Sequence, residues 1–313
     1  MLARSGISRA ETDPDVPVAV YTHPSCLEHD PGPGHPEQPA RLSAVLERLA
    51  LEPSVELRET PDIPRAELER THTAAYLDLL EGVAAAGGGA LDADTLMNAA
   101  SWSAARHAAG GAVACVAHAL SGGGNAFLAA RPPGHHALAD RAMGFCLLAN
   151  AVLAARAAFA TGIDRVLVVD WDVHHGNGTQ ALVEADPAVR FISLHQWPWW
   201  PGTGAAEERG VGNVFNVPRP PGLPATQYVD DLWATVELAM RNWPPDLIIV
   251  SAGFDAMLGD PLGGFTLEPS HYADLTGRLR TQAPRAPVVG VMEGGYIPAR
   301  LAEGVAAHVR ALA

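Results

Sequence analysis

The stretch Val166–Asn177 reads VLVVDWDVHHGN, and it passes from four apolar residues directly into acidic and imidazole side chains. An unbroken run of valine and leucine is typical of a strand that is buried on both faces, as in a parallel sheet. Residues alternate in direction along extended backbone, so Asp170, Asp172 and His174 share one face where the strand ends. A carboxylate and an imidazole at this spacing form half of a metal site, although a hydrogen-bonded structural pair fits equally well.

The same alternation continues along the whole chain. Short apolar runs alternate with longer amphipathic stretches rich in alanine and leucine, which is typical of a mostly parallel sheet with helical connections. The predicted strands are Val16–Tyr21, Asn125–Ala129, Arg165–Val169, Arg190–Leu194, Asn213–Val217, Asp246–Ser251 and Pro287–Met292. The predicted helices are Pro39–Leu49, Thr73–Ala86, Ala99–Leu120, Phe145–Thr161, Ala225–Asn242, Pro269–Ala283 and Pro298–Leu312. No repeat or long linker divides the chain, so we predict one domain over residues 1–313, with residues 1–15 loosely ordered.

Composition narrows the class of protein. The 313 residues are 48% hydrophobic and 18% charged, which is typical of a globular chain with a sizeable core. A net charge of −14 argues against nucleic acid as a partner. Three widely spaced cysteines without a C-x-x-C pair argue against a disulfide framework and against a thiolate zinc site. No apolar stretch reaches about 18 residues, so we expect no membrane partner and a cytoplasmic location.

A second carboxylate, Asp255, follows a later apolar run, after Ile248–Val250 and the residues Ser-Ala-Gly-Phe. Together with Asp172 and His174 it makes a set of two carboxylates and one imidazole. Catalytic zinc takes three protein ligands and keeps one open position. A helix N-cap is the alternative role for Asp255.

Two further loops carry groups suited to catalysis. His135 and His136 follow Pro-Pro-Gly, a stiff turn, and neighbouring imidazoles suit general acid–base chemistry. A solvated pair is the alternative. Tyr296 follows Glu-Gly-Gly, where its hydroxyl could donate to a developing oxyanion. An ordinary half-buried ring is the alternative there. In a parallel sheet all these loops lie beyond the carboxyl ends of the strands, where ligands bind.

Taken together, RPPGHHA, GFC, VDWDVHHGNGTQ, FISLH, PGTG, SAGFDAMLGDPLGG and MEGGY resemble the zinc-dependent histone deacetylase superfamily. The closest resemblance is to its class II and bacterial deacetylase-like amidohydrolase branch, and it runs from His23 through Glu37 and Arg41 to Tyr296. It implies an α/β architecture, the arginase/deacetylase fold, with a central parallel eight-stranded sheet flanked by helices on both faces.

The resemblance also implies a role for individual residues. The implied zinc ligands are Asp172, His174 and Asp255. The implied catalytic residues are His135, His136 and Tyr296, with Asp170 and Asn177 as partners of the two histidines. The implied substrate tunnel is lined by Phe145, Gly144, Trp200 and Leu262. Potassium is implied at an inner site formed by Asp170, Asp172, His174, Ser193 and Leu194, and a second, outer cation near Val183, Asp186, Val189 and Asn213.

The activity implied is a zinc-dependent deacetylase that removes an acetyl or other acyl group from a lysine side chain of a peptide or protein. In that mechanism zinc acts as Lewis acid, His136 takes the proton of the attacking water, and Tyr296 helps to hold the oxyanion. Leu262 stands where polyamine-specific relatives carry a glutamate, which favours lysine substrates. Trp200 replaces the usual phenylalanine and favours the alternative, an acetylpolyamine or other small acylated amine. We weigh Leu262 more, because a carboxylate supplies the charge that recognises a remote ammonium.

Two hypotheses from other classes remain. A ureohydrolase with two manganese ions shares the implied fold, but it needs a denser set of Asp and His than these loops contain. A catalytically silent acyl-lysine binding module would keep the fold without turnover, yet every polar residue that turnover requires is present. The sequence leaves the oligomeric state open.

Overall fold

A computed structural model describes residues 17–313, and an eight-stranded sheet runs through its centre. The strands of this sheet are β1 (Val18–Thr22), β2 (Val55–Glu59), β5 (Ala126–Leu128), β6 (Val166–Asp170), β7 (Val189–Gln196), β8 (Val214–Arg219), β9 (Leu247–Ala252) and β10 (Val288–Met292). Their order is β2-β1-β5-β10-β9-β6-β7-β8, and every neighbouring pair is parallel. The predicted parallel eight-stranded sheet is therefore confirmed.

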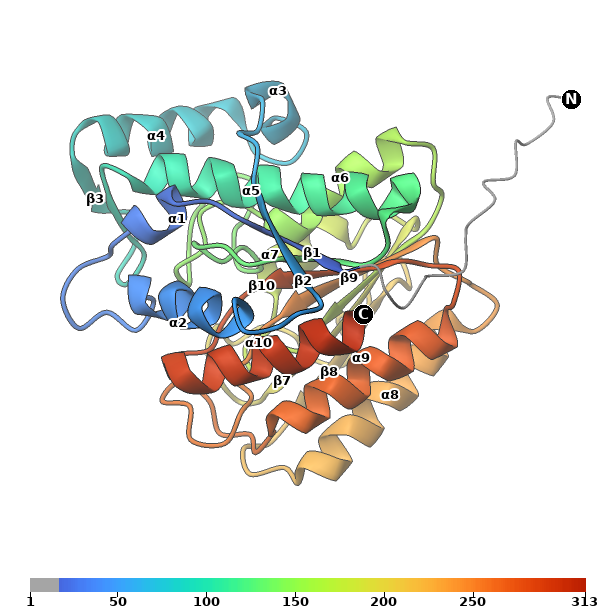
Figure 1. Cartoon of the computed structure of the whole chain (residues 1–313). Helices are drawn as coiled ribbons and strands as arrows, with labels where there is room; N and C mark the ends of the chain where they lie inside the picture. The colour runs from blue at the N-terminus through green and yellow to red at the C-terminus, as the bar shows by residue number, and fades with distance from the viewer. Residues whose placement is uncertain (1–16) are drawn as a thin grey trace, which may run out of the picture.

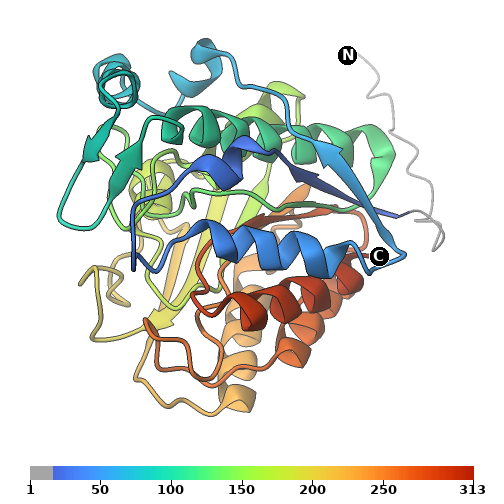
Figure 2. The same ribbon diagram turned by 60° about the vertical axis from the view of Figure 1, so that its left-hand side comes forward.

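Helices cover both faces of this sheet (Figures 1 and 2). One face carries α3 (Arg65–Leu68), α4 (Ala74–Ala85), α5 (Ser101–His118) and α6 (Asn150–Ala160). The other face carries α2 (Pro39–Leu49), α8 (Ala225–Met240), α9 (Pro269–Gln282) and α10 (Pro298–Leu312). The remaining elements are α1 (Ser25–Glu28), α7 (Asn177–Val183), a π-helical turn η1 (Ala119–Gly123) and a hairpin of β3 (Gly88–Ala90) and β4 (Leu96–Asn98).

The apolar core follows from the sequence of the central strands. All residues of β5, β6, β9 and β10 are buried, as expected for strands with helices on both faces. A smaller apolar cluster lies beside them, formed mainly by α4, α5 and α6 with residues 142–148. Within residues 17–313, no helix has both the length and the apolar composition needed to cross a bilayer. The expectation for residues 1–15 lies outside the described residues.

The seven predicted strands are all present, with boundaries shifted by at most two residues, and the predicted first residue Val16 lies outside the described residues. The edge strand β2 escapes prediction because its sequence, VELRE, is mostly polar and it pairs on one side only. The helix predicted from Phe145 begins instead at Asn150. Phe145 has a φ of 66°, in the left-handed region that a right-handed helix excludes, and an isolated β-bridge joins Met143 to Cys146.

Sheet order determines where the polar loops meet. The loops that carry the predicted site residues follow β5, β10, β9, β6 and β7, which are five consecutive neighbours in the sheet. Because these strands are parallel, their carboxyl ends lie along one edge. Segments as far apart in sequence as 131–136 and 293–296 are thereby brought together.

Two glycines inside helices lead to opposite predictions for stability. A Cβ atom on Gly110 of α5 would collide with the backbone carbonyl oxygen of Pro61, so Gly110→Ala should lower the free energy of unfolding by about 1–3 kcal/mol. Gly82 of α4 is exposed and has no heavy atom within 4 Å of the same position. Gly82→Ala should therefore raise the free energy of unfolding by about 0.5–1 kcal/mol. Urea unfolding followed by circular dichroism measures both values, and equal signs would contradict this packing.

Candidate active site

Two carboxylates and an imidazole meet at the ends of β6 and β9. The ligand atoms of Asp172, His174 and Asp255 lie within 4.8 Å of one another. His174 Nδ1 is 3.1 Å from Asp172 Oδ1 and 3.2 Å from Asp255 Oδ2. All three residues are buried. The structure thus brings together the three residues that the sequence suggested as zinc ligands.

The chemistry of this Asp-His-Asp cluster fits a divalent cation. Burial raises the pKa of Asp255, and the neighbouring charge of Asp172 raises it further, to about 7. Two carboxylates packed this closely away from water require a positive counter-charge. Two oxygen donors and one imidazole are a donor set that catalytic zinc uses. The N-cap alternative for Asp255 finds no support, because no helix begins there; its Oδ1 accepts a hydrogen bond from the Val173 N–H at 2.8 Å.

The backbone of the Gly-Gly-Tyr loop packs directly against the cluster. The N–H of Gly294 donates to Asp172 Oδ2 at 2.9 Å. A side chain at Gly294 would collide with the carboxylates of both Asp172 and Asp255. The first glycine of the Gly-Gly-Tyr loop is therefore needed for close approach to the cluster.

The tandem histidines lie beside this cluster, and each has a different partner. His135 Nδ1 donates to Asp170 Oδ2 at 3.0 Å, and His136 Nδ1 donates to Asn177 Oδ1 at 2.8 Å. The two ring centroids are 3.8 Å apart, and both residues are 3% exposed, so the solvated-pair alternative does not hold. Because an acceptor occupies each Nδ1, Nε2 is the nitrogen of His136 that is left to accept a proton.

The pKa values of the two histidines are shifted in opposite directions. Burial disfavours the charged form of His135, but the carboxylates of Asp172 and Asp170 outweigh it and hold its pKa well above the usual value. Burial lowers the pKa of His136, and the charges of His135 and His174 lower it further. An anionic partner on one ring and a neutral amide on the other thus favour a protonated His135 next to a neutral His136.

Tyr296 closes the other side of the site. It is 9% exposed, and its backbone N–H donates to Asp260 Oδ2 at 2.8 Å. Its ring contacts Phe145 at a centroid distance of 5.9 Å, and the Arg41 guanidinium lies 5.0 Å from its centroid. Asp260 was not among the predicted site residues. Its other oxygen, Oδ1, accepts the N–H of Leu262 at 3.0 Å. This one carboxylate therefore joins the tyrosine loop to the loop of Leu262.

Three of the four predicted tunnel residues lie against the histidines or the tyrosine. Trp200 meets His136 edge-on, with centroids 4.7 Å apart, and is 41% exposed. A side chain on Gly144 would collide with both of these rings. Leu262 is half-buried, and its carbonyl accepts a hydrogen bond from Trp199 Nε1 at 3.0 Å. The structure thus places Gly144, Phe145 and Trp200 against the polar groups, with Leu262 linked to Trp199.

A buried ion cluster holds these loops, and sequence reasoning assigned it no role. Glu37 accepts hydrogen bonds from Arg131 at 2.5 and 2.7 Å and from Arg41 at 2.8 Å. Arg131 directly precedes the Pro-Pro-Gly-His-His loop. Arg41 donates to the carbonyl oxygens of Gly295 at 2.6 Å and Glu293 at 2.5 Å. Glu37, Arg41 and Arg131 are all 0% exposed. A charged residue directly after the apolar run 126–130 was the available sequence signal.

The predicted inner and outer cation sites differ in geometry. Asp170 and Ser193 are direct neighbours across the β6–β7 ladder, and Asp172 and His174 belong both to the inner set and to the Asp-His-Asp cluster. At the outer site, the side-chain nitrogen of Asn213 lies 2.9–3.0 Å from the carbonyl oxygens of Val183, Asp186 and Val189. The outer carbonyls are therefore already bonded to an amide.

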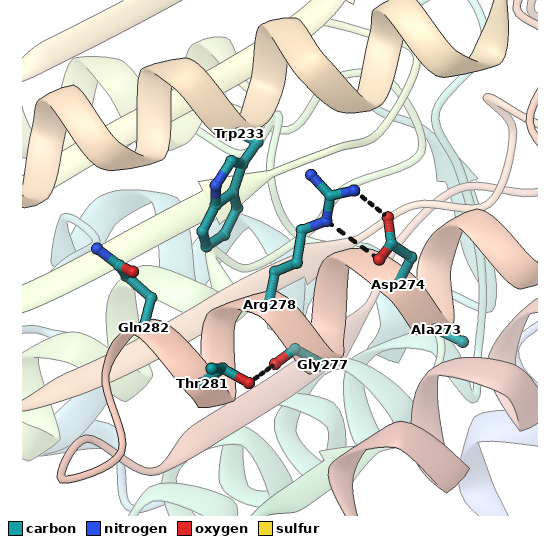
Figure 3. Close-up of a pocket in the computed structure, with 7 residues that line it drawn as sticks. All are labelled: Trp233, Ala273, Asp274, Gly277, Arg278, Thr281 and Gln282. Atoms are coloured by element: carbon teal, nitrogen blue, oxygen red, sulfur yellow. Dashed lines mark hydrogen bonds and ion pairs between the residues drawn. The ribbon is translucent and has the colours of Figure 1, made fainter.

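Two other features do not provide a second reaction centre. His135, Cys146 and Glu293 also have ligand atoms within 4.8 Å of one another, but Glu293 Oε2 accepts the N–H groups of Gly134 and His135 and so shapes the histidine loop. A groove of about 500 Å³ runs between α8 and α9 (Figure 3). Along α9, Arg278 pairs with Asp274 and the Thr281 hydroxyl donates to the Gly277 carbonyl, and none of the site residues lines the groove.

The ion cluster leads to a stability prediction. Burial opposes ionisation of Glu37, but Arg131, His29 and Arg41 hold its pKa well below the usual range. Glu37→Gln would leave two buried guanidinium groups without a counter-charge, so it should lower the free energy of unfolding by about 3–5 kcal/mol at neutral pH. Because the folded-state pKa is lowered, this contribution is present above the ordinary carboxyl pKa and is lost as pH falls through the folded value.

Urea titrations at several pH values measure this difference. Glu303→Gln is the matched control, because Glu303 is 53% exposed and pairs with Arg48 at the surface, where such a pair contributes less than about 1 kcal/mol. Equal losses in the two variants would show that the Glu37 cluster does not hold the fold.

Comparison with known proteins agrees with this geometry. A family model described as "Histone deacetylase domain" matches residues 35–312. The chain is 41% identical over 276 residues to the histone deacetylase-like amidohydrolase of Pseudomonas aeruginosa, covering 84% of this chain and 73% of that protein. It is 35% identical over 297 residues to the human polyamine deacetylase HDAC10, covering 88% of this chain and 44% of that protein.

A solved structure shares the fold as well. The crystal structure of the HDA15 HD domain superimposes with a TM-score of 0.91 at 35% identity, covering 95% of this chain and 88% of that one. With the family model matching most of the chain, fold, family and class of activity agree. The chain belongs to the histone deacetylase family, and it is a deacetylase-type amidohydrolase.

Proposed function

We propose that this protein is a zinc-dependent deacylase that acts on acylated lysine side chains of peptides or proteins. One observation carries the proposal: two buried imidazoles, one bonded to a carboxylate and one to an amide, lie directly beside the buried Asp-His-Asp cluster. This arrangement offers one neutral base and one charged imidazole next to a site for a Lewis acid. Metal-assisted hydrolysis of an amide can use all three.

Asp172, His174 and Asp255 would hold the zinc ion. Zinc bound there would act as a Lewis acid on the scissile carbonyl and on the attacking water. The remaining chemistry belongs to side chains of this protein, and it depends on which protons they hold.

His136 is the proposed general base. Its Nδ1–H donates to Asn177, so Nε2 presents a lone pair. Asn177 is neutral and adds no negative charge, so the imidazole starts in the unprotonated form that a base requires. Trp200 packs edge-on against the ring and limits both its rotation and its exposure to water.

His135 and Tyr296 are proposed to stabilise the negative charge that develops on the substrate. The carboxylate of Asp170 orients His135 and favours its imidazolium, which supplies positive charge beside the reacting carbonyl. Tyr296 keeps its hydroxyl proton, because burial and nearby carboxylates raise its pKa well above the usual value. Its hydroxyl is thus available to donate to the oxyanion. The imidazolium that His136 becomes can return its proton to the leaving amine.

An inner potassium ion is proposed next to this centre. Asp170, Asp172, His174, Ser193 and Leu194 supply side-chain and backbone oxygens from two neighbouring strands. Several buried carboxylates gather here, which favours a further cation. We also propose that the chain forms a single deacetylase domain.

The substrate assignment rests on the mouth of the site. The resemblance makes Leu262 the gate residue, and its side chain is apolar. Trp199, whose indole N–H donates to the Leu262 carbonyl, adds a partly exposed aromatic surface. Apolar walls suit the alkyl stem of an acylated lysine. A polyamine would bring a remote ammonium, which calls for a carboxylate at the gate.

An acetylpolyamine is the second candidate substrate. Trp200 favours it, and a relative that carries the name polyamine deacetylase supports it. The ureohydrolase alternative is disfavoured, because residues 17–313 contain no second cluster with an Asp and His content comparable to that of the Asp-His-Asp cluster.

Substitution of the tyrosine tests the chemistry. Tyr296→Phe removes only the hydroxyl, so it should lower kcat about 10²- to 10³-fold while KM and zinc content stay unchanged. Tyr76→Phe is the control, because that hydroxyl donates to the Leu147 carbonyl at 2.6 Å, within the cluster beside α4, and should not affect kcat. Full activity of the Tyr296 variant would refute the oxyanion role. Absence of turnover by zinc-loaded wild type would favour the binding module.

A second prediction concerns the substrate. Zinc-loaded protein should hydrolyse an acetyl-lysine peptide with higher kcat/KM than N-acetylated putrescine, spermidine or cadaverine, and a hydroxamate should inhibit it. Leu262→Glu should shift the kcat/KM ratio towards the amines about tenfold, since one well-placed charge contributes roughly 1.4 kcal/mol. Leu262→Gln, which has the same length without the charge, should shift it little. A wild-type preference for the amines would overturn the lysine assignment.

A further inference from the structure

Three backbone carbonyls converge on one side chain at the far end of α7. The segment that leads from α7 into β7 turns so that the oxygens of Val183, Asp186 and Val189 point to a common centre. The side-chain nitrogen of Asn213, which precedes β8, lies at that centre, 2.9, 3.0 and 2.9 Å from the three oxygens. Asn213 is 4% exposed, so these bonds are buried.

The orientation of this amide is determined at both ends. Asn213 Oδ1 accepts a hydrogen bond from the N–H of Val211 at 3.2 Å, while the backbone oxygen of Asn213 accepts from the N–H of Phe191 at 2.9 Å. A flipped amide would place Oδ1 against three carbonyl oxygens and leave the donors unpaired. The nitrogen must therefore face the carbonyls.

Converging carbonyl dipoles need positive charge at the point where they meet. A monovalent cation can supply it, and so can N–H donors. The amide nitrogen carries two hydrogens for three acceptors, so one hydrogen is shared, as in a three-centre bond. The side chain of Asp186 belongs to the same segment, but its carboxylate is already paired with Arg156 at 2.5 Å. Arg156 also donates to the Leu182 carbonyl at 3.1 Å.

The resemblance to deacetylases implies an outer cation held by these same four residues, and the structure does not fit one. An ion bound by the three carbonyls would have to occupy the position of the Asn213 nitrogen. The hydrogens of that nitrogen point at the oxygens that would have to coordinate the ion. The residues are those expected, but the position is filled from within the chain.

We propose that the side-chain amide of Asn213 replaces the outer cation, so that this protein binds no ion there. The amide joins the end of α7 to the starts of β7 and β8. Asn177 begins the same helix and holds His136, and Ser193 lies on the same strand that the amide anchors. The contact between α7, β7 and β8, which lies behind the histidine loop, therefore does not depend on a bound ion or on the salt concentration.

Thermal unfolding in different salts tests this substitution. Asn213→Ala removes the donors and leaves three carbonyls facing an open position, so its Tm in choline chloride should be about 3–8 °C below that of wild type. Potassium chloride at equal ionic strength should restore at least half of this loss. Asn213→Asp places carboxylate oxygens against the carbonyls, so its Tm should depend on potassium more strongly still.

Asn216→Ala is the matched control. Asn216 is a half-buried asparagine of β8 whose amide donates to Gln180 Oε1 at 2.8 Å, and its two carbonyl contacts, to Glu208 and Ala205, are longer at 3.4 and 3.5 Å. Its Tm loss should be the same in potassium and in choline. Wild-type protein should show no more potassium dependence than this control.

Cation stoichiometry gives a second readout that needs no folded alanine variant. Equilibrium dialysis with thallium(I), a potassium mimic, followed by mass spectrometry should give one more bound ion per chain in Asn213→Asp than in wild type. Two ions per wild-type chain, or equal stoichiometry in wild type and variant, would overturn the proposal. Neither readout involves substrate turnover, so failure here is distinguishable from failure of the proposed deacylase activity.

Discussion

The structure depends on a single buried carboxylate, Glu37, that pairs with two buried arginines. Through Arg131 it holds the start of the histidine loop, and through Arg41 it holds the carbonyls of the Gly-Gly-Tyr loop. Buried ions are tolerated only when they are paired and fully hydrogen-bonded, so this cluster can exist in one arrangement only. That requirement fixes two loops that lie more than 150 residues apart in sequence, as Gly134 and Glu293 do, relative to each other.

The active site obtains different properties from similar residues. His135 and His136 are neighbours in sequence and in space, yet one faces the Asp170 carboxylate and the other the Asn177 amide. Because charge interactions are strong in a site without water, this difference of one partner is enough to set opposite protonation preferences. The sheet makes it possible, since Asp170 ends β6 and Asn177 begins the helix after it, while Asp255 follows the neighbouring strand β9.

The Asp-His-Asp cluster and the carbonyls after α7 differ in the kind of positive group that they require. In the Asp-His-Asp cluster the donors are carboxylates and an imidazole, which suit a divalent metal. At the turn after α7 the acceptors are neutral carbonyls, and an amide N–H group of Asn213 meets them. Neutral dipoles can be satisfied by neutral donors, whereas adjacent carboxylates cannot. The residue that stands at the centre therefore decides whether an ion is needed.

The sequence by itself determined the parallel sheet and the residues of the Asp-His-Asp cluster, the histidine pair and Tyr296. It could do so because buried strands read as apolar runs and the polar residues stand at their ends, a pattern that is local along the chain. Only the tertiary structure decided how Phe145 interrupts a helix, that Glu37 and Asp260 tie the loops together, and that Asn213 fills the outer site. These features depend on contacts between distant segments and on the space left between them, and neither is encoded in any local pattern.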